Sequence, residues 1–196
     1  MFIQVIQARC SRADELREFG RGWATELGPG ATGWLGSTHG VTDDGEFLGI
    51  VRFASRAAAE ANSARPEQGA WAEKLATYMD GPISFTDHDD VTEFRDGGSD
   101  SAGFVQVIRG RVDDAGRLRK LIDDFGTADE MRPDVIGGTL AIGADGAFTE
   151  TVYFTDEAAA RAGEQDEPPA DVLAELGWAM DGAAFFDLRD PWFESA

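Results

Sequence analysis

The chain has 196 residues and a formal net charge of −20, from 37 acidic and 17 basic residues. Hydrophobic residues make up 42% of the sequence and include 13 phenylalanines and 5 tryptophans, which excludes a disordered chain. An acidic surface repels phosphate groups, so neither nucleic acid nor an anionic membrane is expected as a partner. A single cysteine excludes an intrachain disulfide, and no apolar run reaches the ~18 residues of a membrane helix. We therefore expect a cytoplasmic protein.

The two halves of the sequence resemble each other. Residues 2–9 (FIQVIQAR) match residues 104–111 (FVQVIRGR) at an offset of 102 residues. One residue is then lost, and residues 43–61 match residues 144–162 at an offset of 101. Similarity that extends along both halves indicates a duplication.

The duplication predicts the domain organisation. We expect a first repeat over residues 1–95 and a second repeat over residues 103–196. Residues 96–102 (DGGSDSA) are small, polar and rich in glycine, which is typical of a linker.

Periodicity predicts the same order of elements in each repeat: strand, helix, strand, strand, helix, strand. In the first repeat the expected elements are a strand at 2–9, a helix with an apolar stripe from Ala13 to Trp23, strands at 34–41 and 47–53 joined by a turn at 43–45, a helix from Arg56 interrupted at Pro66, and a strand at 83–86. In the second repeat Pro168 and Pro169 interrupt the corresponding helix. The acidic run Asp87–Asp90 is expected to be a solvated loop, because it lacks the ligand spacing of a calcium site.

This order predicts an α+β fold of two ferredoxin-like βαββαβ repeats. Helices cover one face of such a sheet, yet both sides of the first strand are mostly apolar. We therefore expect the two sheets to face each other and to form an intrachain pseudo-dimeric α+β barrel. Ile3 and Val5 would face the helices while Phe2, Gln4 and Ile6 face the lumen, or the reverse. The chain would then be a monomeric pseudo-dimer, and a homodimer of whole chains stays open.

The order of elements resembles the dimeric α+β barrel superfamily, and within it the antibiotic biosynthesis monooxygenase (ABM) domain. The resemblance also rests on the strand that runs into its helix over Val51–Trp71, and it covers both halves as a fused tandem form. It implies a cofactor-independent monooxygenase, or a related enzyme, that acts on a small apolar, aromatic or polyketide-like molecule. The alternative is a non-catalytic small-ligand-binding or structural barrel protein.

The resemblance also bears on cofactors and on two site residues. Haem-binding relatives carry an iron-ligating histidine on the second helix, and neither 56–80 nor 157–181 contains a histidine. No cofactor is therefore expected, and no zinc spacing or phosphate-binding loop occurs. Relatives that activate oxygen without a cofactor surround the substrate with residues such as Asn and Trp. Asn62 and Trp71 lie on the matching helix and are ligand-binding candidates.

Differences between the repeats indicate two catalytic candidates. His39 aligns with Leu140 in an otherwise similar strand and is a candidate general base, or else a half-buried histidine bonded to a backbone carbonyl. Arg52 aligns with Tyr153 and is expected on the lumen side, where a guanidinium would hold a carboxylate or enolate. The alternative for Arg52 is a surface ion pair. Tyr153 is the corresponding ligand-binding candidate.

Three further residues are candidates for ligand contact. Gln4 and Gln106 lie on equivalent strands, and two amides in one apolar lumen would need each other, water or a ligand as partners. Trp34 opens the strand that carries His39 and would form an aromatic wall, or simply fill the core.

Overall fold

The computed structural model describes residues 1–95, 97–126, 132–165 and 169–196. The chain divides into two compact units: unit 1 is Met1–Asp89 with Asp190–Ala196, and unit 2 is Asp90–Arg189. Each unit contains one five-stranded antiparallel sheet.

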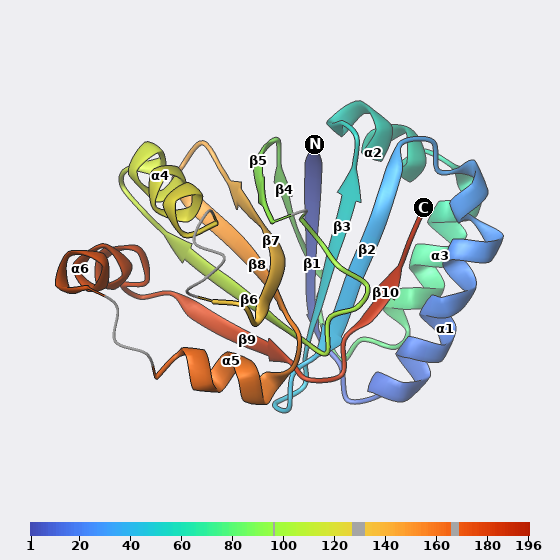
Figure 1. Cartoon of the computed structure of the whole chain (residues 1–196). Coiled ribbons are helices and arrows are strands. Elements are labelled where there is room, and N and C mark those ends of the chain that lie inside the picture. Colours follow the sequence, from blue (N-terminus) through green and yellow to red (C-terminus); the bar gives the residue numbers. More distant parts are fainter. Residues whose placement is uncertain (96, 127–131, 166–168) are drawn as a thin grey trace. The chain divides into compact units, whose positions relative to one another are not determined.

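Unit 1 has the expected ferredoxin-like order and one additional strand. Its elements are β1 (Phe2–Arg9), α1 (Ala13–Glu26), the 3-10 helix η1 (Gly28–Gly30), β2 (Trp34–Val41), β3 (Glu46–Phe53), α2 (Arg56–Ser63), α3 (Pro66–Ala76), β4 (Ser84–His88) and β10 (Trp192–Glu194). The strand order in the sheet is β10-β2-β3-β1-β4. Helices α1 and α3 lie on the same side of this sheet (Figure 1).

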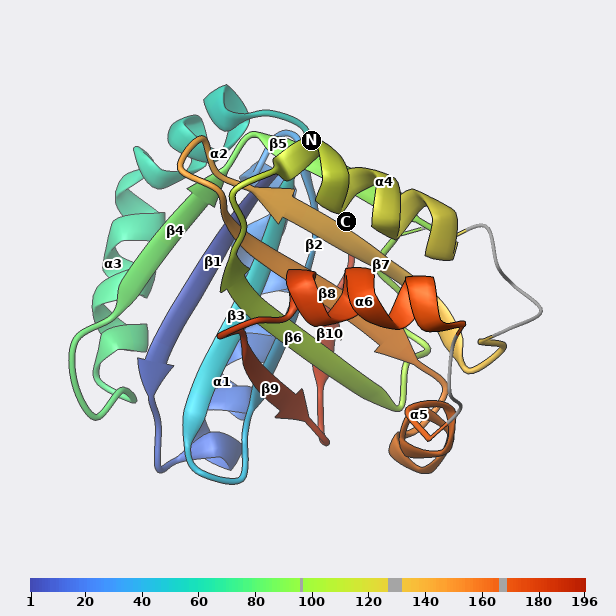
Figure 2. The same ribbon diagram turned by 90° about the vertical axis from the view of Figure 1, so that its left-hand side faces the viewer.

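Unit 2 repeats this architecture. Its elements are β5 (Asp90–Phe94), β6 (Phe104–Arg111), α4 (Ala115–Gly126), β7 (Val135–Ile142), β8 (Ala147–Phe154), α5 (Glu157–Gly163), α6 (Ala170–Ala179) and β9 (Ala184–Leu188). The strand order is β5-β7-β8-β6-β9. Figure 2 shows α4 and α6 across the same face of this sheet. The expected pair of α+β, ferredoxin-like layers is therefore confirmed, and closure of the two sheets into a barrel stays a prediction.

The compact units differ from the expected repeats because each sheet includes the last strand of the other repeat. β10 pairs with β2 in unit 1, and β5 pairs with β7 in unit 2. A four-stranded ferredoxin-like sheet leaves the outer edge of its second strand open, and a fifth strand satisfies those backbone groups. That the first repeat ends at residue 95 and the second begins at residue 103 stays a prediction. Within the predicted linker, residue 96 lies outside the described residues, and 97–102 form neither helix nor strand.

The prediction of a loop at Asp87–Asp90 is wrong. Asp87 and His88 end β4, and Asp90 begins β5. His88 is 2% exposed, on the same face of β4 as its partner Ile3 on β1. The sequence did not predict these strands because the run is mostly charged. Only alternate side chains of a strand have to be buried, so charged residues can occupy the other positions.

The predicted turn and helix ends follow local sequence. Gly45, at φ +83°, closes the hairpin between β2 and β3. Ser55 accepts a hydrogen bond from the Ala58 N–H at 3.2 Å and caps α2, while Pro66 occupies the first turn of α3. In unit 2, Pro169 occupies the N-cap position of α6, and Pro168 lies outside the described residues.

The first of the two face assignments left open by the sequence is wrong, and the reverse one holds. Phe2 packs with Trp23 of α1, and Ile6 packs against the cluster of Leu16 and Leu75, so this side of β1 faces the helices. Ile3 and Val5 point to the opposite face and are each 1% exposed. Since both faces of the strand are buried, alternation of apolar residues does not distinguish them.

Candidate functional site

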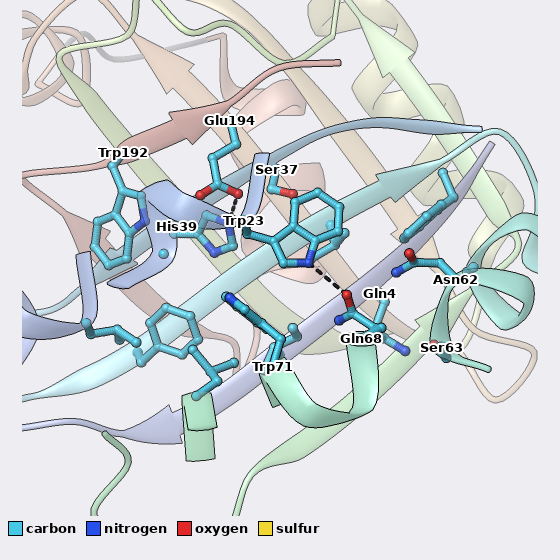
Figure 3. A pocket seen from close by; sticks show the side chains of 18 residues that line it. Gln4, Trp23, Ser37, His39, Asn62, Ser63, Gln68, Trp71, Trp192 and Glu194 are labelled. Atoms are coloured by element: carbon cyan, nitrogen blue, oxygen red, sulfur yellow. Dashed lines mark hydrogen bonds and ion pairs between the residues drawn. The ribbon is translucent and has the colours of Figure 1, made fainter. Parts of the chain in front are cut away.

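A pocket of about 80 Å³ lies in unit 1 between the sheet and the helices α1, α2 and α3. Side chains of β1, β2, β3 and β10 form its floor, and the three helices close it from above. Figure 3 shows His39, Trp192 and Glu194 grouped at one end of the pocket and Gln4, Asn62, Gln68 and Ser63 at the other. Most of the remaining lining is apolar, which suits a ligand with a hydrophobic body.

His39 packs against two aromatic rings that also lie close to each other, with the ring centres of Phe47 and Trp192 6.2 Å apart. Its imidazole stacks on Trp192 with ring centres 5.7 Å apart and on Phe47 with ring centres 6.0 Å apart. Trp192 comes from β10, where it lies directly opposite His39 in the strand pairing. Two stacked neighbours fix the plane of the ring, so its nitrogen atoms have defined directions.

Glu194 is the carboxylate beside this histidine. Its Oε2 lies 3.7 Å from Nε2 of His39, with side-chain exposures of 8% and 14%. The other oxygen, Oε1, is buried and has no hydrogen-bond donor among the described residues. Glu194 therefore lies where it would stabilise the imidazolium that forms when His39 accepts a proton.

Two glycines make room for this pair. A Cβ at Gly49, opposite His39 on β3, would lie 3.1 Å from its Nδ1. A Cβ at Gly20 on α1 would lie 3.8 Å from Oε1 of Glu194 and 3.6 Å from Nε1 of Trp192. The close approach of α1 to β10 therefore depends on a small residue at position 20.

The other end of the pocket carries two amide side chains, and hydrogen bonds to residues outside the pocket fix their orientation. Gln4 donates through Nε2 to Oδ1 of Asp87 at 2.9 Å. Asn62 accepts from Nη1 of Arg65 at 2.9 Å. These bonds use the amide nitrogen of Gln4 and the oxygen of Asn62, so an acceptor of the first and a donor of the second remain for a ligand.

Tryptophans line the space between the two polar ends. Trp23 on α1 donates through Nε1 to Gln68 at 2.7 Å, and its ring meets Trp71 of α3 edge-on at 6.5 Å. Trp71 also stacks on Phe19 at 5.0 Å. Fixed aromatic walls of this kind favour a flat aromatic guest.

The structure brings four of the eight predicted site residues together. His39, Gln4, Asn62 and Trp71 all line this pocket. Trp34 lies behind it, packed on Trp23 at 4.7 Å and bonded to Ser37 at 3.0 Å, so it supports the wall.

The other three predicted residues lie elsewhere. Arg52 and Tyr153 are buried on the faces of their strands that point away from the helices. Gln106 lines a separate cavity in unit 2 and not the pocket of Gln4. The prediction that Gln4 and Gln106 share one lumen is wrong, because each side chain faces the helices of its own unit.

Sequence reasoning missed Trp192 and Glu194. They lie in a three-residue strand that pairs with a strand more than a hundred positions earlier, and no periodicity marks so short a segment. The available signal was the pair of aromatic residues, Trp192 and Phe193, beside an acid close to the end of the sequence.

The structure offers no metal site within the residues that it describes, where no group of three or more potential ligands occurs. Cys10 is buried, and burial raises the pKa of its thiol, so it is poorly suited to act as a nucleophile. Among the described residues, none of the helices has the length and apolar character needed to cross a membrane.

Comparison with protein-family models and with curated proteins gives no match. Three solved structures are similar over nearly the whole chain. A candidate monooxygenase from Lactobacillus acidophilus has a TM-score of 0.73 and 12% identity, covering 100% of this chain and 97% of its own. A candidate monooxygenase from Fusobacterium nucleatum has a TM-score of 0.76 and 9% identity, covering 99% and 94%. An anthrone oxidase-like protein has a TM-score of 0.63 and 12% identity, covering 100% and 94%.

The chain has the fold of these proteins. At such low identity the similarity shows the fold alone, and the function has to be inferred from the residues of the site. The resemblance in fold expected from the sequence is thereby confirmed.

Proposed function

We propose that unit 1 binds a flat aromatic molecule of the anthrone type, with an oxygen substituent at one end of its ring system and an oxidisable ring carbon at the other, and oxidises it with molecular oxygen without a cofactor. The observation that carries the proposal is the His39–Glu194 pair at one end of a pocket walled by tryptophans. The similarity in fold to candidate monooxygenases and to an anthrone oxidase-like protein supports it.

The two polar ends of the pocket match a molecule of this type. The amide N–H of Asn62 would donate a hydrogen bond to the oxygen at one end of the ring system, and the Trp23 and Trp71 rings would hold its apolar body. The opposite, reacting end of the molecule would then lie at His39. A bound molecule of this kind would displace water from the pocket, which would strengthen the polar interactions within it.

The first step of the reaction is a proton transfer. For an anthrone, His39 would remove a proton from the ring carbon opposite the carbonyl group, and the electron pair would be delocalised onto the carbonyl oxygen. The imidazolium formed in this way would be stabilised by Glu194, which is buried beside it. Asn62 would donate a hydrogen bond to the oxygen on which negative charge develops.

Oxygen enters in the second step. The carbanion carbon donates electrons to O₂ and forms a carbon–oxygen bond, and the imidazolium returns its proton to give a hydroperoxide. Loss of the second hydrogen from this carbon, with cleavage of the oxygen–oxygen bond, releases water and leaves a carbonyl group. One O₂ is consumed, one of its atoms enters the product, and the other leaves as water.

The test measures oxygen uptake with anthrone and with a panel of hydroquinones, using protein shown to contain no flavin, haem or metal. We expect uptake above the uncatalysed rate and a stoichiometry of one O₂ for each quinone formed. His39→Gln should lower the rate by a factor of about 10²–10⁴, the range for removal of a general base. Glu194→Gln should also lower it, by a smaller factor. Glu60→Gln, which removes an exposed carboxylate from α2, serves as the matched control.

A rate that His39→Gln leaves unchanged in folded protein would contradict the assignment of the base. Binding of these aromatic compounds without oxygen uptake would favour the alternative function, a ligand-binding protein, and would show as quenching of tryptophan fluorescence. If the protein neither binds these compounds nor takes up oxygen with them, the proposal for this pocket is refuted.

A further inference from the structure

Unit 2 contains a cavity of its own, of about 200 Å³, between its sheet and the helices α4 and α6. Its wall is mostly apolar and includes Phe94, Ile108, Ile122, Val152, Phe154 and Leu176. The cavity lies on the helix-facing side of the sheet, as the unit 1 pocket does, but the polar groups in it are different.

The acid Glu150 on β8 lines this cavity. It is 6% exposed and makes no hydrogen bond or ion pair with any residue that the structure describes. Burial raises the pKa of its carboxyl group to about 7. The corresponding residue of the first repeat is Gly49, so the fold itself does not require an acid at this position. A buried carboxyl group without a partner destabilises the protein, which indicates that a ligand supplies the partner.

A second hydrogen-bond acceptor lies on the neighbouring strand. Gln106 on β6 is opposite Val152, which places it diagonally from Glu150 on the same face of the sheet. Its Nε2 donates to Oδ1 of Asp187 at 3.0 Å. The amide nitrogen is therefore engaged, and the amide oxygen is an acceptor at the cavity.

The other charged side chains that line the cavity form hydrogen bonds or ion pairs within the protein. Arg132 forms a bidentate ion pair with Asp134, with N···O distances of 3.0 and 2.7 Å. Arg95 donates to the backbone carbonyls of Arg132 and Val135. Glu164, which also lines the cavity, accepts a hydrogen bond from Nη1 of Arg161 at 2.8 Å in an ion pair. Glu150 pairs with none of these arginines, so its charge, when ionised, is left for a ligand to neutralise.

We propose that this cavity binds an apolar amine, a molecule with one protonated amino group on a hydrocarbon or aryl body, whose ammonium group pairs with Glu150. An ammonium group has up to three donors and can serve both Glu150 and the oxygen of Gln106, whereas a hydroxyl group has one donor and no charge. Positive charge also compensates a buried carboxylate, which a neutral donor does not. The net charge of −20 further raises the local concentration of cations.

The proposal is independent of the function proposed for unit 1, and calorimetry on the whole chain tests it with 2-phenylethylamine as the probe. We expect the amine to bind at least about tenfold more tightly than 2-phenylethanol, which has the same body and a hydroxyl group. Glu150→Gln should weaken amine binding at least about tenfold, since it keeps the shape of the side chain and removes its charge. Asp123→Asn is the matched control, because it removes an exposed carboxylate from α4 of the same unit.

A second readout reports the protonation of Glu150 directly. Below about pH 7 the free protein holds Glu150 largely protonated, so binding of the ammonium ion should release that proton to solvent. The amine keeps its own proton, and no covalent bond of the ligand changes. Calorimetry in two buffers with different heats of ionisation counts the released protons, and Glu150→Gln should release none.

Three results would overturn the proposal. The first is equal binding of the amine and the alcohol, or binding of neither. The second is undiminished amine binding by folded Glu150→Gln. The third is loss of amine binding in Glu194→Gln but not in Glu150→Gln, which would place the amine in unit 1. If Glu150→Gln does not fold, Ile122→Trp, which fills the cavity and keeps the acid, replaces it, and unchanged affinity then refutes the proposal. These experiments measure binding and not oxygen uptake, so their failure is distinguishable from failure of the unit 1 proposal.

Discussion

Replacing His39 with leucine tests how much the contact between His39 and Glu194 contributes to the free energy of unfolding. Leucine fits a strand position of this kind, since Leu140 occupies the equivalent position of unit 2 and is fully buried there. The neighbourhoods differ, however, because Phe94 stands in unit 2 where Glu194 stands in unit 1. His39→Leu would therefore leave the Glu194 carboxylate buried without the imidazole beside it.

The expected cost follows from that orphaned carboxylate. A buried polar group deprived of its partner destabilises a protein by about 1–3 kcal/mol. For a chain of this length that corresponds to a fall in melting temperature of about 2–4 °C for each kcal/mol. Shape-preserving exchanges in a core cost less than about 1.5 kcal/mol, so an excess above that value measures the effect of Glu194.

A double-mutant cycle measures the coupling. The four proteins are the parent, His39→Leu, Glu194→Leu and the double variant, and the assay is denaturant unfolding at neutral pH. We expect the double variant to be more stable than the sum of the single changes predicts, with a coupling of about 1 kcal/mol or more, because it leaves neither the carboxylate nor the imidazole without its partner. Single effects that add to within about 0.5 kcal/mol would show that the two side chains do not interact, and the base proposed for unit 1 would lose its partner.

Three further predictions concern the whole chain. Glu150→Gln should stabilise the protein, and the gain should grow between pH 4.5 and about 7 and then level off at about 3 kcal/mol, because in that range the unfolded chain loses the Glu150 proton before the folded chain does. A gain that is independent of pH in parallel melts would contradict the raised pKa. Added sodium chloride should raise the melting temperature from its low-salt value, since a net charge of −20 is screened over about 10 Å at 0.1 M salt. A flat or falling melting temperature would show that attraction between opposite charges outweighs repulsion. The isolated fragment 1–95 should fail to form a stable monomer, because it lacks β10 at the open edge of β2, and cooperative unfolding of monomeric fragment would refute this.

The elements that local sequence determines were predicted correctly. The strand at Phe2–Arg9 agrees with its predicted range, and the helices broken at Pro66 and Pro169 follow from period, turn and cap signals within a few residues. His39 emerged because comparison of the repeats exposed a polar side chain in a strand position that is otherwise apolar. These inferences rest on residues close together in the sequence, or on the internal comparison that the duplication provides.

The features that depend on distant pairing were not predictable in the same way. β5 and β10 are short strands rich in acidic or aromatic residues, and only their pairing with β7 and β2 makes them strands. The side of the sheet that faces the helices was undetermined, since both sides are buried and carry the same kind of residue. Glu194 was therefore missed. Arg52 lies on the face of the sheet away from the helices, the side expected for it, and its role as a ligand-binding group stays a prediction.

The cross-strand positions of the two pockets account for the two different functions that we propose for one fold. His39 is opposite Gly49 in unit 1, and Leu140 is opposite Glu150 in unit 2, so each unit places one ionisable side chain at the same pair of positions but on opposite strands. In unit 1 a side chain at position 49 would crowd the imidazole, because a Cβ there would lie 3.1 Å from Nδ1 of His39. In unit 1 the partner is supplied from a third strand by Glu194, and the pair can accept and return a proton. In unit 2 that third strand carries Phe94, so Glu150 lacks an internal partner and is suited to select the charge of a ligand.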